Sequence, residues 1–502
     1  MTEDSKEIIL VFDCGATNLK VVAVNSVGKI AASASFQNSP SSQKEGKPGW
    51  LIWDLNEIWR KLCLSTKKVL EKIDPRDVKA VTVTTWGADG APVRRDGSLT
   101  YPPISWQCPR TEETAKKIEE KISPWEIFRI TGYQITSFNT LFRLMWLREN
   151  VPEALDEAYT WLMMPGLITY KLCREFHIEP TSASTMMAMD LRKRDWSAQL
   201  LELADLDPSF FPEWIEPGQT VGYVTEKAQK ECGVPSGVPV VVGGHDTQFA
   251  LFGSGARMDE AILSSGTWEI LGVRSDMFNP TRSAFENGLL FEADVQRGLW
   301  NPQLLMMGSG VLEWILDKVF PMMGDKKYDL MIREAEGEPA GSNGIMFIPC
   351  FVKETGPAKK YGTLGTILGL TLRTSRGQLL RSALEGLSFQ LRHALEILKA
   401  EIPAGIRGIR VVGGGSKNPL WNQIRADVTG LPVITTEQKE YTSLGAAITA
   451  FIGMGLYKSL DEARKYIFSE ERRFEPSSRA DIYNALFKRY IDALESLKDY
   501  YR

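Results

Sequence analysis

The first 35 residues alternate between short β-favouring runs and turns. The runs are Ile8–Phe12, Leu19–Val24 and Lys29–Ser35, and the stretches 13–18 and 25–28 between them contain Gly, Asn, Asp and Ser. Runs of this length, bounded by such residues, are typical of strands joined by tight turns. The pattern predicts an antiparallel meander at the start of the chain.

Helical spacing follows the meander. Asp54, with Glu57 three residues later, predicts a capping box at the start of a helix. The apolar positions then recur every three or four residues through Leu55, Ile58, Trp59, Leu62, Val69, Leu70 and Ile73. The β-favouring run Val78–Thr85, rich in Val and Thr, comes next and predicts a strand. A helix that crosses between strands indicates an α/β domain.

A strand, a turn and a strand occur again in the second half. Ala261–Leu263 and Trp268–Val273 flank the turn 264–267, in the manner of the opening strands around Asp13. Two halves with similar starts predict a duplicated fold.

The break between the halves is expected near residue 257. The apolar strand Val238–Val242 precedes it, and the flexible residues Gly253, Ser254 and Gly255 suit a domain boundary. We therefore expect an N-terminal domain of residues 1–257 and a C-terminal domain of residues 258–502.

Five further elements complete the expected second half. The spacing predicts a long helix over Gln378–Ala400, a strand over Gly408–Val412 and a helix that opens at Asn418. The charged, periodic stretch Ala480–Tyr500 predicts a surface helix. The apolar stretch Leu444–Tyr457 predicts a buried helix, because it falls short of the roughly 18 residues that a membrane helix needs.

Composition narrows the class of protein. The chain has 502 residues, of which 43% are hydrophobic and 24% charged, as in ordinary globular proteins. The formal net charge of −4 supplies no basic field for nucleic acid. The acidic start and its short apolar run predict no export signal. Six scattered cysteines without a CxxC pair, and three histidines, predict reduced thiols in the cytoplasm and no zinc site.

The first candidate site is the turn after the opening strand. Walker A and GxGxxG phosphate motifs are absent from the sequence. Gly15 would let backbone N–H groups approach an anion, and Thr17 adds a hydroxyl. Because the Asp13 carboxylate would repel phosphate, it suits this site only with a cation between them, which indicates Mg²⁺. An ordinary hairpin turn is the simpler interpretation of this motif alone.

Two later turns have similar chemistry. Gly266 and Thr267 repeat the glycine and hydroxyl, and together with the first turn they favour a site for a nucleotide phosphate chain. Three glycines at 413–415, between a strand and a helix, would let a bulky ligand lie against the backbone. A plain strand-to-helix loop is the alternative for this third turn.

Polar residues also follow two apolar strands. Asp246 ends a wholly apolar strand and is the candidate general base, able to take the proton of a substrate hydroxyl during phosphoryl transfer. The alternative is that Asp246 caps the next helix and His245 is a buried core histidine. Asp89 could hold sugar hydroxyls or form a tight Asp-Gly turn. Trp106 could offer a flat face to a sugar or be packed in the core.

The order of these motifs resembles the FGGY carbohydrate kinases from nearly one end of the chain to the other. The matching segments are residues 13–18, 84–90, 104–110, 137–141, 244–253, 263–269, 309–314 and 411–415. The resemblance implies an α/β, actin-like ATPase fold of two ribonuclease-H-like domains, with a ligand cleft between them. It also implies an ATP-dependent sugar kinase that uses Mg²⁺.

The resemblance implies a role for each matching position. Asp246 would be the base, and Asp13 would lie near Mg²⁺, bound through water. The phosphate and adenosine side would comprise Gly15, Thr17, Gly266, Thr267, Gly310, Gly414, Gly415 and Asn418. The sugar side would comprise Gly87, Asp89, Trp106, His245 and Thr247.

Two departures from the family pattern bear on the substrate. Many members have Trp-x-Asp-x-Arg where this chain has Cys108 in the middle position, which argues against glycerol and xylulose as substrates. The usual Pro-Asp-Tyr is replaced by residues 165–167, Pro-Gly-Leu. The expected reaction is conversion of a deoxy-ketohexose, L-fuculose, to L-fuculose 1-phosphate. L-rhamnulose or another ketose is the alternative substrate, and a catalytically silent sugar or nucleotide sensor is the alternative function. A homodimer is one option for its assembly.

Overall fold

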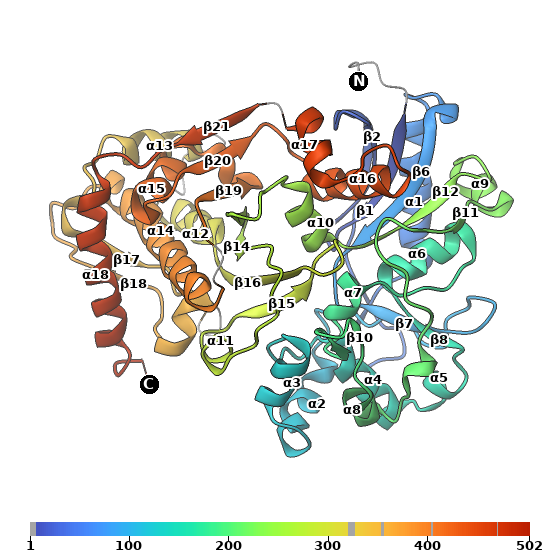
Figure 1. Ribbon diagram of the computed structural model, residues 1–502. Helices are drawn as coiled ribbons and strands as arrows, with labels where there is room; N and C mark the ends of the chain where they lie inside the picture. The colour runs from blue at the N-terminus through green and yellow to red at the C-terminus, as the bar shows by residue number, and fades with distance from the viewer. Residues whose placement is uncertain (1–6, 320–326, 353–355, 403–404, 469, 502) are drawn as a thin grey trace. The chain divides into compact units, whose positions relative to one another are not determined.

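The computed structural model describes residues 7–319, 327–352, 356–402, 405–468 and 470–501 (Figure 1). The described residues form two compact units. The first unit takes its residues from 1–255, 291–301 and 440–469, and the second from 256–290, 302–439 and 470–502. Each unit is therefore built from several separate stretches of the chain.

A six-stranded sheet forms the centre of the first unit. Its strands, in spatial order, are β11 (Thr220–Tyr223), β12 (Pro239–His245), β6 (Val78–Thr85), β1 (Ile8–Cys14), β2 (Asn18–Asn25) and β3 (Ile30–Gln37). β1, β2 and β3 pair antiparallel, which confirms the predicted meander. β6 pairs parallel to β1, and β12 pairs parallel to β6.

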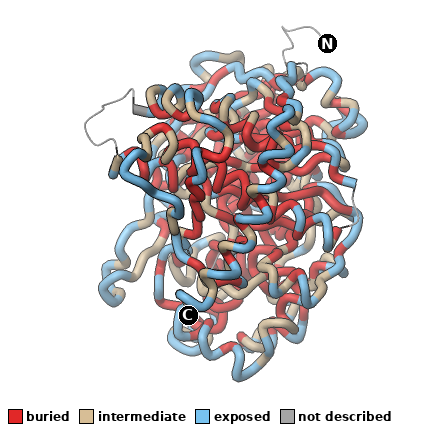
Figure 2. The backbone as a smooth tube through the Cα atoms, turned by 90° about the vertical axis from the view of Figure 1, so that its left-hand side faces the viewer, coloured by how far each residue is buried: buried red, intermediate tan, exposed pale blue. Residues whose placement is uncertain are grey.

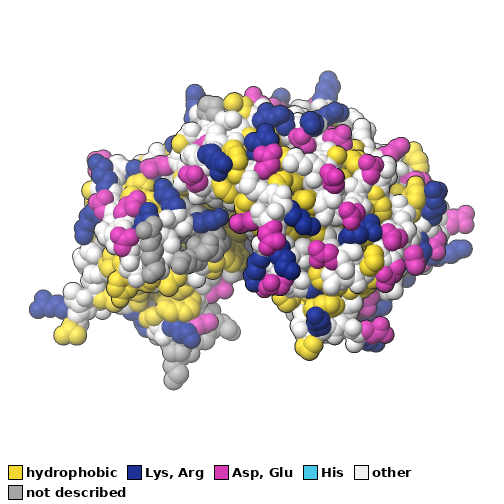
Figure 3. All heavy atoms as spheres, turned by 90° about the horizontal axis from the view of Figure 1, so that it is seen from below, with side chains coloured by type: hydrophobic (Ala, Val, Ile, Leu, Met, Phe, Trp, Pro, Cys, Tyr) yellow, Lys and Arg dark blue, Asp and Glu magenta, His cyan; other side chains and the backbone are white. Residues whose placement is uncertain are grey.

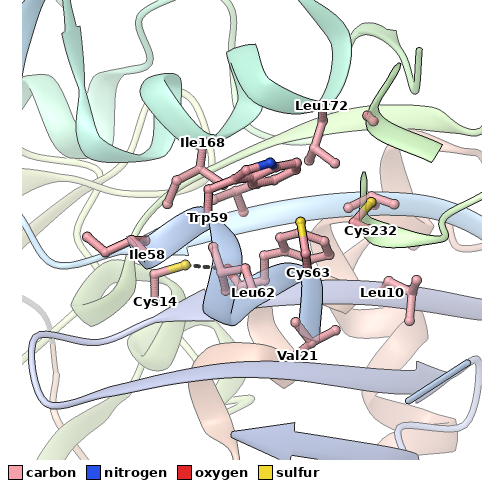
Figure 4. Packing of buried hydrophobic residues seen from close by; sticks show 14 of the residues in the cluster. Leu10, Cys14, Val21, Ile58, Trp59, Leu62, Cys63, Ile168, Leu172 and Cys232 are labelled. Carbon is pink, nitrogen blue, oxygen red and sulfur yellow. Dashed lines mark hydrogen bonds between the residues drawn. The ribbon is translucent and has the colours of Figure 1, made fainter. Parts of the chain in front are cut away.

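Alternate residues of β1 enter two different cores, because successive side chains of a strand point to opposite faces. Leu10 and Phe12 pack with α1 (Leu55–Leu70), α6 (Met164–Cys173) and α9 (Glu226–Cys232). Figure 4 shows part of this cluster, where Cys14, Cys63 and Cys232 lie among apolar side chains. Ile9 and Val11 pack with α10 (Asp246–Gly253), α16 (Tyr441–Gly453) and α17 (Leu460–Ile467).

Two helices of this unit differ from their predicted bounds. Asp54 caps α1 by accepting from the amides of residues 56 and 57, as expected. The Glu57 carboxylate instead accepts from Arg60, so the reciprocal half of the capping box is not formed. α1 ends at Leu70, and Ile73 packs on the core from outside the helix. α16 runs from Tyr441 to Gly453 rather than from 444 to 457.

A second sheet has seven strands, six of which repeat the strand order of the first, with β15 added at one edge. It runs β15 (Leu290–Ala293), β16 (Trp300–Met307), β14 (Trp268–Gly272), β13 (Glu260–Ser265), β19 (Gly408–Val412), β20 (Val433–Thr436) and β21 (Glu471–Phe474). β13, β14 and β16 form an antiparallel meander, and β19 pairs parallel to β13. This repetition confirms the predicted duplication and the α/β class.

Five helices enclose the core of the second unit. They are α12 (Ser309–Val319), α13 (Lys327–Glu336), α14 (Arg376–Glu401), α15 (Pro419–Thr429) and α18 (Ala480–Leu497). α14 starts at a capping box formed by Ser375 and Gln378. α18 lies on the surface as predicted, but one face is buried through Tyr483, Tyr490 and Leu494, so it also closes this core.

The remaining elements are short or peripheral. The strands are β4 (Ser41–Ser42), β5 (Leu51–Ile52), β7 (Gly90–Val93), β8 (Thr160–Met163), β9 (Met189–Asp190), β10 (Asp195–Trp196), β17 (Met346–Ile348) and β18 (Thr366–Leu368). The helices are α2 (Glu112–Lys116), α3 (Pro124–Thr131), α4 (Thr140–Asn150), α5 (Glu153–Asp156), α7 (Pro180–Ser184), α8 (Ala198–Leu201) and α11 (Arg282–Glu286).

The interior of the protein is buried and its surface carries charges of both signs. Buried residues run through the interior in Figure 2, while the exposed ones follow the outer turns. All six cysteines are buried and carry free thiols. Lys and Arg alternate with Asp and Glu across the face shown in Figure 3. Within the described stretches, no helix has the length and apolar character needed to cross a membrane.

Candidate active site

The candidate base lies where β12 ends and α10 begins. Small residues let β12 lie close to its neighbours: a Cβ at Gly243 would come 2.0 Å from the Val83 carbonyl oxygen, and one at Gly244 2.3 Å from Thr181 Oγ1. Asp246 follows as the first residue of α10, with 28% of its side chain exposed. Its Oδ1 accepts from the Thr247 amide at 2.7 Å. The carboxylate is therefore held in place yet reachable by a substrate.

His245 is a charged neighbour of this base. Its side chain is buried, with Nδ1 2.9 Å from Glu292 Oε2 and Nε2 3.5 Å from Asp246 Oδ1. Burial opposes a charge on the ring, but the carboxylates of Glu292, Asp246 and Glu179 outweigh burial and raise the pKa of His245 to about 9. Burial raises the pKa of Asp246, while the His245 charge lowers it. An imidazolium next to the base favours the ionised base that proton abstraction needs.

A second carboxylate belongs to the same unit. Asp13, at the end of β1, accepts from Ser443 Oγ at 3.0 Å and from Thr84 Oγ1 at 3.4 Å. Burial and, secondly, the Asp246 charge raise the pKa of Asp13 from 3.8 to about 6. In the absence of ligands, the protein thus holds two carboxylates whose charges repel each other.

Asp13→Asn is expected to stabilise the unliganded protein at neutral pH. Because the folded state binds the Asp13 proton more tightly than the unfolded chain, stability falls as pH rises from about 3.8 to about 6. The Asp13→Asn variant has no carboxyl group to ionise at this position, so it does not lose stability in this way. Its free energy of unfolding should therefore exceed that of the wild type by roughly 1–3 kcal/mol at pH 7.5. Urea unfolding at pH 7.5 and pH 4.0 measures this difference. An equal gain at both pH values would contradict it.

The turn after β1 is partly occupied by its own hydrogen bonds. The Gly15 amide donates to the Asn18 carbonyl at 2.8 Å, and the Gly15 carbonyl accepts from Asn38 Nδ2 at 3.1 Å. The Gly15 N–H is therefore used within the turn rather than presented to an anion. Thr17 is exposed, and its hydroxyl accepts from Asn18 Nδ2 at 3.5 Å. Of the two predicted phosphate contacts, Thr17 is the accessible one.

One of the predicted sugar residues, Asp89, is a fully buried carboxylate that bonds the backbone of another, Trp106. Asp89 Oδ2 accepts from the indoles of Trp53 at 2.5 Å and Trp86 at 2.8 Å, and from the Trp106 amide at 3.1 Å. Arg143 lies 2.7 Å from Asp89 Oδ1. The bond from its amide fixes the Trp106 backbone, while the residue as a whole stays 40% exposed. A direct bond from Asp89 to a sugar would require one of these partners to be exchanged.

Gly87 leaves space for the His245 ring. A Cβ at Gly87 would come 3.0 Å from His245 Nε2 and 2.8 Å from Thr185 Cγ2. A side chain there would push the ring away from Asp246. The structure thus brings Gly87, His245, Asp246 and Thr247 together at one edge of the first sheet.

The other predicted glycine turns belong to the second unit. The turn of Gly266 and Thr267 joins β13 to β14, and their carbonyls accept from the amides of Gly308, Ser309 and Gly310 at 2.8–3.2 Å. These bonds hold the start of α12 against the turn. Thr267 is exposed, so its hydroxyl remains accessible to a ligand.

The glycine turn after β19 packs on the same strand end. A Cβ at Gly415 would come 2.0 Å from Ser265 Oγ, whereas one at Gly414 would meet no atom of the described residues within 4 Å. Gly415 is therefore needed for close packing, and Gly414 borders open space. Asn418 is buried and caps α15 by accepting from the Trp421 amide at 3.0 Å. Its predicted contact with adenosine would add to this structural role.

A buried ion pair links these turns. Arg425, from α15, donates to Ser265 Oγ at 2.8 Å and pairs with Glu269. Both members of the pair are fully buried. Ser265 Oγ also donates to Glu269 Oε1 at 2.6 Å. Three side chains thus tie α15 to the two strands that flank the Gly266 turn.

Sequence reasoning missed three residues of these networks. Glu292 and Ser443 reach the first unit from stretches far along the chain, and Arg425 lies within an ordinary helical pattern. Neither spacing nor a local motif marks any of them. Only the folded chain brings Ser443 to Asp13 and Glu292 to His245.

The residues present fit ATP and a magnesium ion. Mg²⁺ commonly binds one or two carboxylates together with the phosphates of its substrate. Asp13 offers such a carboxylate, and a bound cation would oppose the burial and the Asp246 charge that raise its pKa. The open space beside Gly414 suits a nucleotide lying against the backbone.

Comparison with known proteins agrees with this fold. Residues 8–253 match the N-terminal domain and residues 261–454 the C-terminal domain of the FGGY family of carbohydrate kinases. The L-fuculokinase of Escherichia coli K12 is 38% identical over 476 residues, covering 95% of this chain and 98% of that protein. The rhamnulokinase of Bacteroides thetaiotaomicron is 31% identical over 411 residues, covering 81% of this chain and 83% of that protein.

A solved structure supports the fold independently. The xylulose kinase of Rhodospirillum rubrum superposes with a TM-score of 0.88 over 99% of both chains, at 22% sequence identity. The α/β units have the actin-like ATPase fold that the sequence predicted. With both family domains matched in order, this chain belongs to the FGGY family of carbohydrate kinases.

Proposed function

We propose that this protein is an ATP-dependent kinase that transfers the γ-phosphoryl group of ATP to O1 of L-fuculose. The observation that carries the proposal is the reachable Asp246 carboxylate beside a charged histidine. The 38% identity to an L-fuculokinase over nearly the whole chain supports the choice of sugar. The products are L-fuculose 1-phosphate and ADP.

Asp246 acts as the general base. It accepts the proton of the sugar hydroxyl as that oxygen forms its bond to the γ-phosphorus and the bond from phosphorus to the ADP oxygen breaks. The proton then leaves Asp246 for solvent. His245 supports this step because its positive charge favours the ionised carboxylate.

The predicted nucleotide residues form the phosphate side. Thr17 and Thr267 present exposed hydroxyls, and Gly266, Gly310, Gly414 and Gly415 shape the backbone around the second-unit turns. Asp13 would hold Mg²⁺ through water, and the ion would neutralise phosphate charge. Gly15 shapes the first turn, and Asn418 holds the start of α15.

An aromatic residue, Trp106, and a small one, Gly87, shape the sugar side. The exposed Trp106 ring offers an apolar face to the deoxy end of the sugar. Gly87 keeps the His245 ring in place, and His245 and Thr247 flank the base. Asp89 anchors the Trp106 loop. Arg110, in the same loop, is buried and bonds Tyr101 and Gln43, so it serves the packing of the loop.

A substrate panel tests the proposal. ADP release with Mg²⁺·ATP is measured across L-fuculose, L-rhamnulose, L-ribulose, D-xylulose and glycerol, and kcat/KM is compared. We expect L-fuculose to be preferred. A preference for L-rhamnulose, the alternative favoured by 31% identity to a rhamnulokinase, would keep the mechanism and change the sugar. ADP release with none of the five would favour a sensor.

Three further expectations stay predictions. The six unpaired cysteines suit the reducing environment of the cytoplasm, which is the location we propose. The boundary near residue 257 and a homodimer are also open to test, by limited proteolysis and by sedimentation.

A further inference from the structure

Glu292 is the centre of a buried polar network next to the candidate base. Its side chain is almost fully buried at 3% exposure. It accepts from His245 Nδ1 at 2.9 Å and from the Tyr133 hydroxyl at 2.7 Å, and Gln248 Nε2 donates to it as well. Asn301 Nδ2 in turn donates to Gln248 Oε1 at 2.5 Å. Three side chains thus hold one carboxylate in a fixed position, and Asn301 holds one of the three, Gln248.

The His245 ring is constrained from both sides. Its Nδ1 faces Glu292, and its Nε2 lies 3.5 Å from Asp246 Oδ1. The backbone N–H of His245 donates to Thr181 Oγ1 at 2.9 Å, and Thr181 in turn donates to Glu179. Three carboxylates therefore face this histidine: Glu292, Asp246 and Glu179.

We propose that Glu292 is a positioning residue for the phosphoryl transfer: it anchors His245 through Nδ1, so that the doubly protonated ring presents its Nε2–H to the Asp246 carboxylate. This inference rests on the proposed role of Asp246 as the base. Glu292 acts through His245 and touches neither sugar nor nucleotide in this assignment. The arrangement fixes both the ring orientation and the charge beside the base, as a carboxylate does for a catalytic histidine in other enzymes.

The alternative is that Glu292 only stabilises the fold. A buried carboxylate that accepts several hydrogen bonds stabilises a fold at any position. Its loss would then lower the stability of the protein without changing the protonation of His245. The two roles differ in one observable, the protonation of His245 in the folded protein.

Nuclear magnetic resonance of the histidine rings measures that observable directly. The chain has only three histidines. Burial lowers the pKa of His177 to about 4, and burial with the Lys360 charge lowers that of His393 to about 4. At pH 7.5, His245 should therefore be the one doubly protonated ring in ¹⁵N-histidine-labelled protein. The other two resonances report whether a variant remains folded.

Glu292→Gln keeps the shape of the side chain and removes its charge. We expect the His245 ring of this variant to become neutral at pH 7.5, while the His177 and His393 signals keep their positions. Tyr133→Phe is the matched control, because it removes one donor but keeps the carboxylate, and its His245 ring should stay charged. A charged His245 in Glu292→Gln, or a neutral one in the wild type, would overturn the proposal.

Kinetics supply a second readout. Losing a charged hydrogen bond should lower kcat of Glu292→Gln by roughly 10- to 100-fold, with KM for ATP unchanged. The alkaline fall of kcat should move from near pH 9 to a lower pH, because His245 loses its proton earlier. An unchanged pH profile would contradict the positioning role.

The two proposals fail in different ways. The ring titration uses unliganded protein, so its outcome does not depend on which sugar is the substrate. If Asp246 were not the base, the His245 signal would still respond to Glu292→Gln, but kcat would not. If Glu292 did not position His245, the Glu292→Gln variant would turn over the sugar panel like the wild type, and its His245 ring signal would be unchanged.

Discussion

Asp246→Asn is expected to lower kcat by roughly 10²- to 10⁴-fold, the usual cost of losing a general base. The amide has the shape of the carboxylate but cannot take the proton of the sugar hydroxyl. Its Oδ1 can still accept from the Thr247 amide, so the start of α10 should be unchanged. Steady-state ADP release with saturating sugar and Mg²⁺·ATP measures the effect.

Nucleotide binding is the control for this variant. Because Asp246 is assigned to the sugar hydroxyl and the variant keeps every residue assigned to the nucleotide, the Kd for ATP measured by calorimetry should change little. Turnover close to that of the wild type would show that another group takes the proton. A loss of both turnover and ATP binding would indicate a damaged fold instead.

Arg425→Met is expected to destabilise the protein by about 3–5 kcal/mol, because it leaves the buried Glu269 carboxylate without its cation. Burial already raises the pKa of Glu269, and the Arg425 charge opposes this shift. The variant also removes the donor that holds Ser265 Oγ. Urea unfolding followed by circular dichroism measures the change.

Two further variants test whether the unpaired Glu269 charge causes the loss of stability in Arg425→Met. Glu269→Gln combined with Arg425→Met removes both charges and should recover much of the lost stability, since a buried charge would no longer stand alone. Arg60→Met breaks an exposed bidentate pair with Glu57 and should leave the unfolding midpoint unchanged. If Arg425→Met also left the unfolding midpoint unchanged, the buried pair would contribute no more to stability than the exposed pair.

The sequence predicted the elements whose periodicity is strong. The opening meander, the strand Val78–Thr85 and the long helix α14 were all expected, because each has many apolar positions at one spacing. Boundaries were less accurate where packing overrides spacing. Ile73 keeps helical spacing yet packs from outside α1, and Gly455, with φ of +79°, lies in the turn that follows α16.

The site was predictable only in its local parts. The strand-end position of Asp246 and the glycine turns stand out in the sequence, because polar or glycine residues after apolar strands mark binding edges. The side chains that tune them do not. Glu292 and Ser443 lie 46 and 197 residues beyond Asp246 in the numbering, and only tertiary contacts bring them to His245 and Asp13.

The return of residues 440–469 to the first unit governs the order in which the chain can fold during synthesis. α16 and α17 cover the sheet face that contains Ile9 and Val11. A ribosome makes that strand first and those helices only after nearly all of the second unit. Of the helices on this face, only α10 is made early. The nascent first unit must therefore keep the rest of the face uncovered until residues 441–467 have been made, a period in which chaperones would protect it from aggregation.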